Sequence, residues 1–173
     1  MEYGKITPDI LDSLYRICGK QFVFTSREAI ENYSHDYTED LRFYPEVVVK
    51  PVTADEISEI LKICNEHMIP ATPRGAGTGL SGGALPVFGG IVISMERFNR
   101  ILEIDERNLQ ATVEPGVINQ VFQDAVMEKG LFYPPDPASR GSCFLGGNIA
   151  ECAGGPKAVK YGVTKDYVLN TQM

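Results

Sequence analysis

The sequence lacks several features that would identify common classes of protein. Its 173 residues include no tryptophan, two histidines and four cysteines. The cysteines, Cys18, Cys64, Cys143 and Cys152, form no Cys-x-x-Cys pair, and neither histidine lies near such a pair, which argues against a zinc site. A chain of this length needs no disulfide staples, so we expect reduced thiols and a cytoplasmic protein.

Long apolar runs are also missing. No run approaches the roughly 18 residues that a membrane span needs, and residues 1–5 do not resemble a signal peptide. The net charge of −7 argues against generic binding to nucleic acid or to an anionic membrane, because like charges would meet. With 43% apolar and 23% charged residues, the composition is typical of a folded protein with one domain or two small lobes.

Glycine is scarce in the first part of the chain and abundant in the second. Gly4 and Gly19 stand alone, whereas the other 15 of the 17 glycines lie at or after Gly75. This clustering indicates discrete glycine-rich loops rather than a low-complexity segment.

Local signals predict a mixture of helices and strands. Thr7 and Pro8 are typical of a helix start, and Gly19 ends that helix. Capping boxes at 25–28 and 53–56 predict two more helices, the second with its apolar face continuing to Met68. The periodicity predicts strands over 21–24, 46–50, 70–72, 91–94, 101–105, 109–113 and 131–133, and the start of another at 167–173.

Two further helices are predicted in the second part. One follows Pro115 and Gly116, carries Val117, Val121, Ala125 and Met127 on its apolar face, and ends at Gly130; a shorter one lies near 148–152. The chain is therefore expected to be α+β, with a helical portion over 1–44 and a β-rich remainder.

The first glycine-rich segment, loop 1, runs from Pro73 to Gly83. Closely spaced glycines let successive backbone N–H groups point at one anion, while Arg74 could add a charge and Thr78 a hydroxyl. The spacing formally matches a Rossmann fingerprint, but the prolines and glycines over 86–90 leave no room for the helix that this motif must open. A mobile surface turn is the alternative; phosphate binding is favoured.

The second glycine-rich segment, loop 2, runs from Gly141 to Gly155, after the stiff Pro134–Pro137 stretch. Its small residues would let a flat ligand approach the backbone, and Asn148 offers both a donor and an acceptor. An ordinary Ω-like loop is the alternative. Long irregular stretches inside compact domains are uncommon unless functional, and two such loops suggest one elongated ligand.

Several stretches, in this order and spacing, resemble the FAD-binding (PCMH-type) domain of the vanillyl-alcohol-oxidase-like flavoproteins. The resemblance is strongest to the branch of the glycolate oxidase D-subunit and D-lactate dehydrogenase. The matching stretches are 44–51, 64–83, 113–117, 130–137, 145–150, 153–156 and 160–164.

The resemblance implies a PCMH-type fold of two α+β subdomains with FAD between them, occupying 45–173. It implies that the pyrophosphate lies on loop 1, that two prolines and a glycine line the cleft, and that loop 2 contacts the flavin end. The residues so implied are Pro73, Arg74, Gly75, Ala76, Gly77, Thr78, Gly79 and Leu80; Pro115, Gly116 and Pro137; and Ser142, Cys143, Gly146, Gly147, Asn148 and Ala150.

The family oxidises D-2-hydroxy acids such as glycolate or D-lactate by hydride transfer to flavin N5, and passes the electrons to a protein or quinone acceptor. Some relatives attach FAD through a histidine in the first loop; Thr78 stands there, so a non-covalent flavin is expected. A thioether through Cys143 remains the alternative. Cys152 replaces the asparagine usual in this branch, which leaves open any polar contact there.

The family's substrate-binding cap, with its catalytic residues, follows the FAD domain. The chain is expected to be a fragment that is incomplete at its C-terminus and lacks the cap, so no catalytic residue and no metal ligand is predicted. Two alternatives remain: a stand-alone FAD- or nucleotide-binding module without catalysis, and the flavin domain of a nucleotide-sugar enol-ether reductase. His35 and His67 are expected in a solvated loop and at a helix end.

Overall fold

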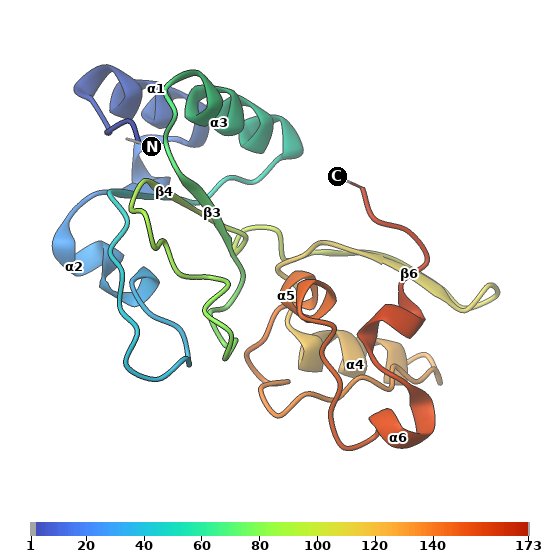
Figure 1. Cartoon of the computed structure of the whole chain (residues 1–173). Helices are drawn as coiled ribbons and strands as arrows, with labels where there is room; N and C mark the ends of the chain where they lie inside the picture. The colour runs from blue at the N-terminus through green and yellow to red at the C-terminus, as the bar shows by residue number, and fades with distance from the viewer. Residues whose placement is uncertain (1–2, 173) are drawn as a thin grey trace. The chain divides into compact units, whose positions relative to one another are not determined.

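A computed structural model describes residues 3–172 (Figure 1). The chain forms two compact units that divide between Phe98 and Asn99. This division differs from the expected lobe boundary near residue 44. The helices of the first 44 residues pack in the same core as the strands that follow them, because their apolar faces have no other surface to cover.

A four-stranded sheet forms the centre of the first unit. Strands β1 (Val23–Phe24), β2 (Val47–Val49), β4 (Ile91–Ser94) and β3 (Ala71–Arg74) lie in that spatial order. The last three are parallel to one another, whereas β1 is antiparallel to β2. Strands β2 and β4 are buried throughout, which explains their continuous valine and isoleucine runs.

Helices cover both faces of this sheet (Figure 1). Helices α1 (Pro8–Cys18) and α3 (Ala54–Glu66) pack on the face that carries the odd-numbered residues of β2 and β4. Helix α2 (Arg27–Ile30) covers the even-numbered residues on the other face and continues into the 3-10 turn η2 (Glu31–Tyr33). A second 3-10 turn, η1 (Lys20–Phe22), joins α1 to β1.

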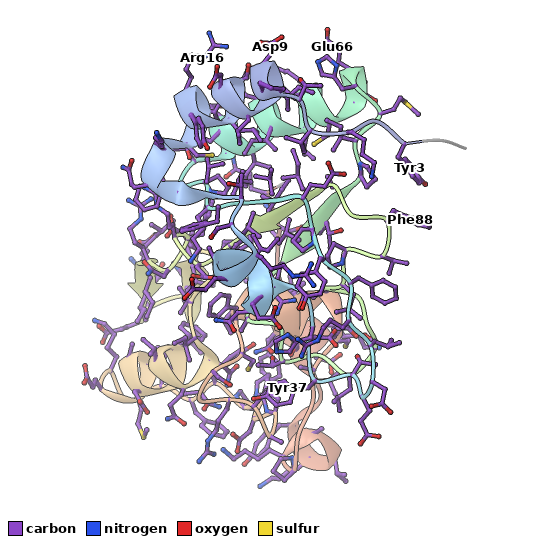
Figure 2. All side chains as sticks on the ribbon, turned by 90° about the vertical axis from the view of Figure 1, so that its left-hand side faces the viewer. Tyr3, Asp9, Arg16, Tyr37, Glu66 and Phe88 are labelled. Carbon is purple, nitrogen blue, oxygen red and sulfur yellow. The ribbon has the colours of Figure 1, made fainter. Side chains whose placement is uncertain are left out.

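The apolar stripes of α1 and α3 face the sheet, and their polar residues face outward. Figure 2 shows Asp9, Arg16 and Glu66 pointing away from the sheet. The buried residues of the shared core are Ile10, Leu14, Cys18, Val23, Val47, Val49, Ile60, Cys64, Ile69, Ile91 and Ile93.

The helix starts follow the predicted signals with two differences. Thr7 caps α1 as expected, since its side chain accepts from the Ile10 amide. For α2 the cap is Ser26 rather than the preceding threonine. At α3, Thr53 accepts from the Glu56 amide, but the carboxylate of that glutamate reaches back one residue further, to the amide of Val52.

The second unit packs helices on a two-stranded hairpin. Strands β5 (Ile101–Asp105) and β6 (Gln110–Val113) are antiparallel. Helices α4 (Asn119–Met127), α5 (Leu145–Ala150) and α6 (Ala158–Tyr161) and the 3-10 turn η3 (Thr164–Tyr167) follow. The core combines Val117, Phe122, Val126 and Leu145 with partly buried residues of both strands.

Three local predictions for this unit were wrong. The buried face of α4 carries Asn119, Phe122 and Val126, whereas Val121 and Met127 are exposed. Residues 131–133 form no strand, because the Leu131 amide bonds back to α4 and the carbonyl of residue 133 accepts from a glutamine of α4. Residues 168–172 belong to no strand, and Met173 lies outside the described residues.

Three findings on residues 3–172 concern the thiols, membrane spans and metal sites. All four cysteines are free thiols. Within that range no helix is long and apolar enough to cross a membrane, and no cluster of His, Cys, Asp or Glu is suited to a metal ion.

Candidate cofactor site

Loop 1 leaves the sheet at the carboxyl end of β3. Arg74 is the last residue of this parallel strand, and the glycines follow it directly. In open α/β sheets, ligands bind beyond the carboxyl ends of the parallel strands. The position of loop 1 therefore suits a ligand site.

The backbone of loop 1 presents a row of hydrogen-bond donors. Within residues 3–172, the N–H groups of residues 75–80 donate to no protein acceptor. Gly77 has a φ of +69°, which lets the chain curl, and a Cβ placed on Gly79 would meet no atom within 4 Å. Consecutive, uncovered N–H groups of this kind can hold an anionic oxygen, so the loop fits a diphosphate.

The side chain of Arg74 fixes the position of loop 1 through hydrogen bonds to the backbone around it. Its guanidinium is buried and donates to the backbone carbonyls of Asn32, His35 and Ala84 at 3.0, 2.7 and 3.3 Å. Burial lowers the pKa of this guanidinium, and the nearby Asp36 carboxylate opposes that shift. The side chain therefore holds the loop in place, and a contact between its charge and a phosphate stays a prediction.

The segment 32–38 is the partner of loop 1, and sequence reasoning missed it. It supplies two of the carbonyls that receive Arg74, and the Tyr37 amide donates to the Gly79 carbonyl at 3.2 Å. Because these contacts use main-chain atoms, no side-chain motif in the sequence could have revealed them.

A polar cluster occupies the same edge of the sheet. Glu96 accepts from Lys50 Nζ and from the Tyr33 hydroxyl, both at 2.6 Å, and from Ser94 Oγ at 3.0 Å. Burial alone would raise the pKa of Glu96, but the hydrogen bonds from Lys50 and Tyr33 outweigh it and lower the pKa. Burial and Glu96 raise the pKa of Tyr33. The group is a satisfied ion-pair network that ties η2 to β2 and β4.

In the second unit, loop 2 is joined to the start of α4. The Leu145 and Gly146 amides donate to the carbonyls of Val117 and Pro115 at 2.9 and 2.8 Å. A Cβ on Gly146 would lie 2.6 Å from the Pro115 Cβ, so only glycine permits this approach. The predicted residues Pro115 and Gly116 therefore lie beside the predicted residues of α5.

Two of the predicted loop 2 residues are buried. Asn148 Nδ2 donates to Asn119 Oδ1 at 3.0 Å, and Asn119 Nδ2 donates in turn to the Pro135 carbonyl. Cys143 is buried next to this pair, where its carbonyl accepts from the Asn119 amide. The amide nitrogen of Asn148 thus joins α5 to α4, and the expected contact of Asn148 with the flavin stays a prediction.

Asp136 organises the stretch that contains Pro137. This buried carboxylate accepts from Arg140 at 2.9 Å and from Lys157 at 3.1 Å. Arg140 first, and then Lys157, holds its pKa below the usual range. Gly155 lies against the Asp136 carbonyl so closely that any side chain there would collide with it.

Other predicted residues of loop 2 stay accessible. Ser142 and Ala150 are exposed, Gly147 is half-buried, and a Cβ on Gly147 would meet no atom within 4 Å. Among the predicted residues of this loop, the accessible parts are thus backbone and small side chains, which fits a flat ligand.

Two cavities of the described residues lie elsewhere. One of about 600 Å³ is lined by residues of α1, most of them polar or charged. One of about 290 Å³ lies between α4 and residues 131–133, with Arg140 and Lys157 at its edge. Neither is lined by a residue of loop 1 or loop 2, so neither is assigned to the cofactor.

Comparison with known proteins agrees with this geometry. The family described as "FAD binding domain" matches residues 45–173. Over 97% of its length the chain is 47% identical to the glycolate oxidase subunit GlcD of Bacillus subtilis (strain 168), of which it covers 36%. Over 96% of its length it is 41% identical to the D-lactate dehydrogenase of Anaerostipes hadrus, of which it covers 35%.

The fold is found in a solved structure as well. An alkyldihydroxyacetonephosphate synthase superposes with a TM-score of 0.86 at 20% identity, over 98% of this chain and 33% of that protein. The chain thus spans about a third of the relatives it matches. It belongs to the FAD-binding domain family, with the PCMH-type α+β fold, and is similar to the corresponding part of a glycolate oxidase subunit and of a D-lactate dehydrogenase.

Proposed function

We propose that the protein oxidises a D-2-hydroxy acid of the glycolate or D-lactate type, with FAD bound non-covalently. When bound, the flavin accepts the hydride of the hydroxy acid at N5. The observation that carries the cofactor part of the proposal is the row of uncovered N–H groups at 75–80.

Loop 1 would hold the diphosphate through this backbone, with Arg74 fixing its shape. In loop 2, Gly147, Ser142 and Ala150 present backbone and small side chains that would contact the flavin end. Neither loop contains a histidine, which supports non-covalent attachment.

The substrate class comes from the relatives. Those matched include a glycolate oxidase subunit, a D-lactate dehydrogenase and the D-2-hydroxyglutarate dehydrogenase of Stutzerimonas stutzeri (strain A1501). We assign the residues that bind and activate the acid to the part of these relatives that this chain does not span. An acceptor protein or a quinone would take up the electrons.

The first experiment is a visible absorption spectrum of the purified protein, followed by acid precipitation. FAD in the supernatant is expected; flavin that stays with the precipitate would contradict non-covalent binding. A colourless protein that takes up no added FAD would contradict the assignment of the two loops.

The second experiment uses a flavin-loaded protein extended to the full length of its relatives and mixes it, without oxygen, with D-lactate, glycolate, L-lactate or NADPH. Bleaching by D-lactate or glycolate is the expected result. Bleaching by NADPH alone would instead favour a reductase. If a protein extended to the full length of its relatives bound FAD but was bleached by no 2-hydroxy acid, it would be a flavin-binding module or act on another substrate.

A further inference from the structure

Two buried oxygen atoms in the segment beside loop 1 have no partner. Asp36 Oδ2 and Thr38 Oγ1 are covered from solvent, and neither forms a hydrogen bond within the described residues. The other carboxylate oxygen of Asp36 is satisfied, since it accepts from the Thr38 amide at 2.8 Å. An uncompensated buried polar atom is costly, so a pair of them calls for an explanation.

The position of these atoms connects them to loop 1. They flank Tyr37, whose amide donates to the Gly79 carbonyl in the middle of the uncovered N–H groups. The backbone carbonyl of His35, the residue before Asp36, accepts a hydrogen bond from the Arg74 guanidinium. Segment and loop are thus bonded to each other on both sides of Asp36, at His35 and at Tyr37.

The chemistry of the pair differs from that of the loop. A carboxylate oxygen only accepts hydrogen bonds, and a threonine hydroxyl can accept or donate one. Together they suit a hydroxyl group, whereas a second phosphate would be repelled by Asp36. Acidic side chains bind sugar hydroxyls in this way in other nucleotide-binding folds.

We propose that Asp36 and Thr38 bind a hydroxyl of the sugar chain next to the diphosphate on loop 1. The inference rests on the proposed role of loop 1 in binding FAD. In FAD the diphosphate has the ribose on one side and the ribityl chain on the other, so the same polyol chemistry has two sources. The two residues are positioning residues for the cofactor and take no part in the reaction.

The test compares FAD affinity and stability in four proteins: the wild type, Asp36→Asn, Thr38→Val and the control Asp40→Asn. Asp40 lies two residues after this segment, is exposed and has a φ of +59°, which asparagine tolerates. Asp36→Asn places an amide donor where an acceptor is needed and should weaken FAD binding about tenfold or more. Thr38→Val should weaken it by roughly fivefold; Asp40→Asn should bind like the wild type.

The melting temperature of the flavin-free protein distinguishes a site for the ligand from a site that holds only a structural water. If the oxygens are kept for the ligand, Thr38→Val removes an unsatisfied group and should leave the melting temperature of the flavin-free protein unchanged or higher. A lower melting temperature with unchanged FAD affinity would mean that a structural water satisfies the pair, and the proposal would be wrong.

Fragments of the cofactor identify the hydroxyl. Weaker binding of ADP by Asp36→Asn, with FMN unaffected, assigns the ribose; the reverse assigns the ribityl chain. If ADP is affected, the defect must disappear with 2′-deoxy-ADP or 3′-deoxy-ADP, and its persistence with both overturns the proposal. A defect that EDTA abolishes would point to a bound cation and overturn it too.

The two proposals fail in different ways. If the wild type itself takes up no FAD, the role of loop 1 is wrong and this inference falls with it. If the wild type binds FAD and both variants bind it equally well, only the inference is wrong.

Discussion

Arg74 Nη2 donates to the His35 carbonyl at 2.7 Å, across 39 positions of sequence. The same guanidinium reaches two further carbonyls, so one buried side chain sets the distance between loop 1 and the segment beside it. A cation in a phosphate-binding loop is readily taken for a ligand contact; here it satisfies the protein's own backbone.

Replacement of Arg74 is therefore expected to destabilise the protein. Arg74→Lys keeps the charge, but a single ammonium group lacks the fork that spans three carbonyls. We expect a loss of about 2–4 kcal/mol in the free energy of unfolding. Urea denaturation measures it, and Arg107→Lys, at an exposed position, is the control. A stable Arg74→Lys protein with weakened FAD binding would restore the phosphate-contact interpretation.

Two glycines of loop 1 should respond differently to alanine. At Gly77, with a φ of +69°, a Cβ would collide with the Arg74 guanidinium, so Gly77→Ala is expected to lower the melting temperature. At Gly79 the Cβ meets open space, so Gly79→Ala should keep the stability but weaken FAD binding about tenfold, because the methyl group screens the N–H groups. Thermal melts and flavin titration distinguish the two; equal FAD affinity for Gly79→Ala and wild type would contradict a diphosphate on this backbone.

The Asn119–Asn148 pair is expected to be energetically coupled. Asn148→Ala leaves Asn119 Oδ1 without its donor, and Asn119→Ala leaves Asn148 Nδ2 without its acceptor. Each variant should cost about 2 kcal/mol of unfolding free energy. The double variant should cost less than the sum of the two, which a double-mutant cycle by urea denaturation detects. Asn170→Ala, at an exposed position in the same unit, serves as the control. Strict additivity would show that the hydrogen bond contributes nothing.

The free energy of unfolding is expected to fall at alkaline pH because two thiols, those of Cys18 and Cys64, are buried in the core. Burial raises the pKa of Cys18 and of Cys64 from 9.0 to about 11. Above pH 9 the unfolded chain releases these protons while the folded chain retains them, so stability is full below pH 9 and falls until about pH 11. The slope is roughly 1.4 kcal/mol per pH unit for each thiol. Urea denaturation between pH 8 and 10.5 measures it, and a Cys18→Ala/Cys64→Ala variant should show a shallower slope.

Local signals predicted the first unit well. Thr7 and Pro8 begin α1 and Gly19 ends it, so each signal acts on the turn of the helix next to it. The valine and isoleucine runs mark strands that are buried on both faces. The buried face of α4 was missed because it includes Asn119, a polar residue whose partners come from a distant loop.

At the candidate site, too, some features could be predicted from the sequence and others could not. The glycine clusters identified both loops, because conformational freedom and close approach are properties of glycine itself. The roles of Arg74 and Asn148 could not be predicted, since their partners are main-chain carbonyls for the first and a residue 29 positions away for the second. Asp36 and Thr38 carried no signal because an unpaired oxygen becomes visible only once its surroundings are folded.

Because the four thiols are buried to different degrees, a thiol reagent should modify loop 2 at one cysteine, Cys152. Cys18, Cys64 and Cys143 are buried, whereas Cys152 is half-buried directly after α5. Because the thiolate is the reactive form, the raised pKa values of the two core thiols protect them further from alkylation. A maleimide fluorophore should attach at Cys152 in the unmodified sequence and serve as an optical reporter beside the loop that we assign to the flavin.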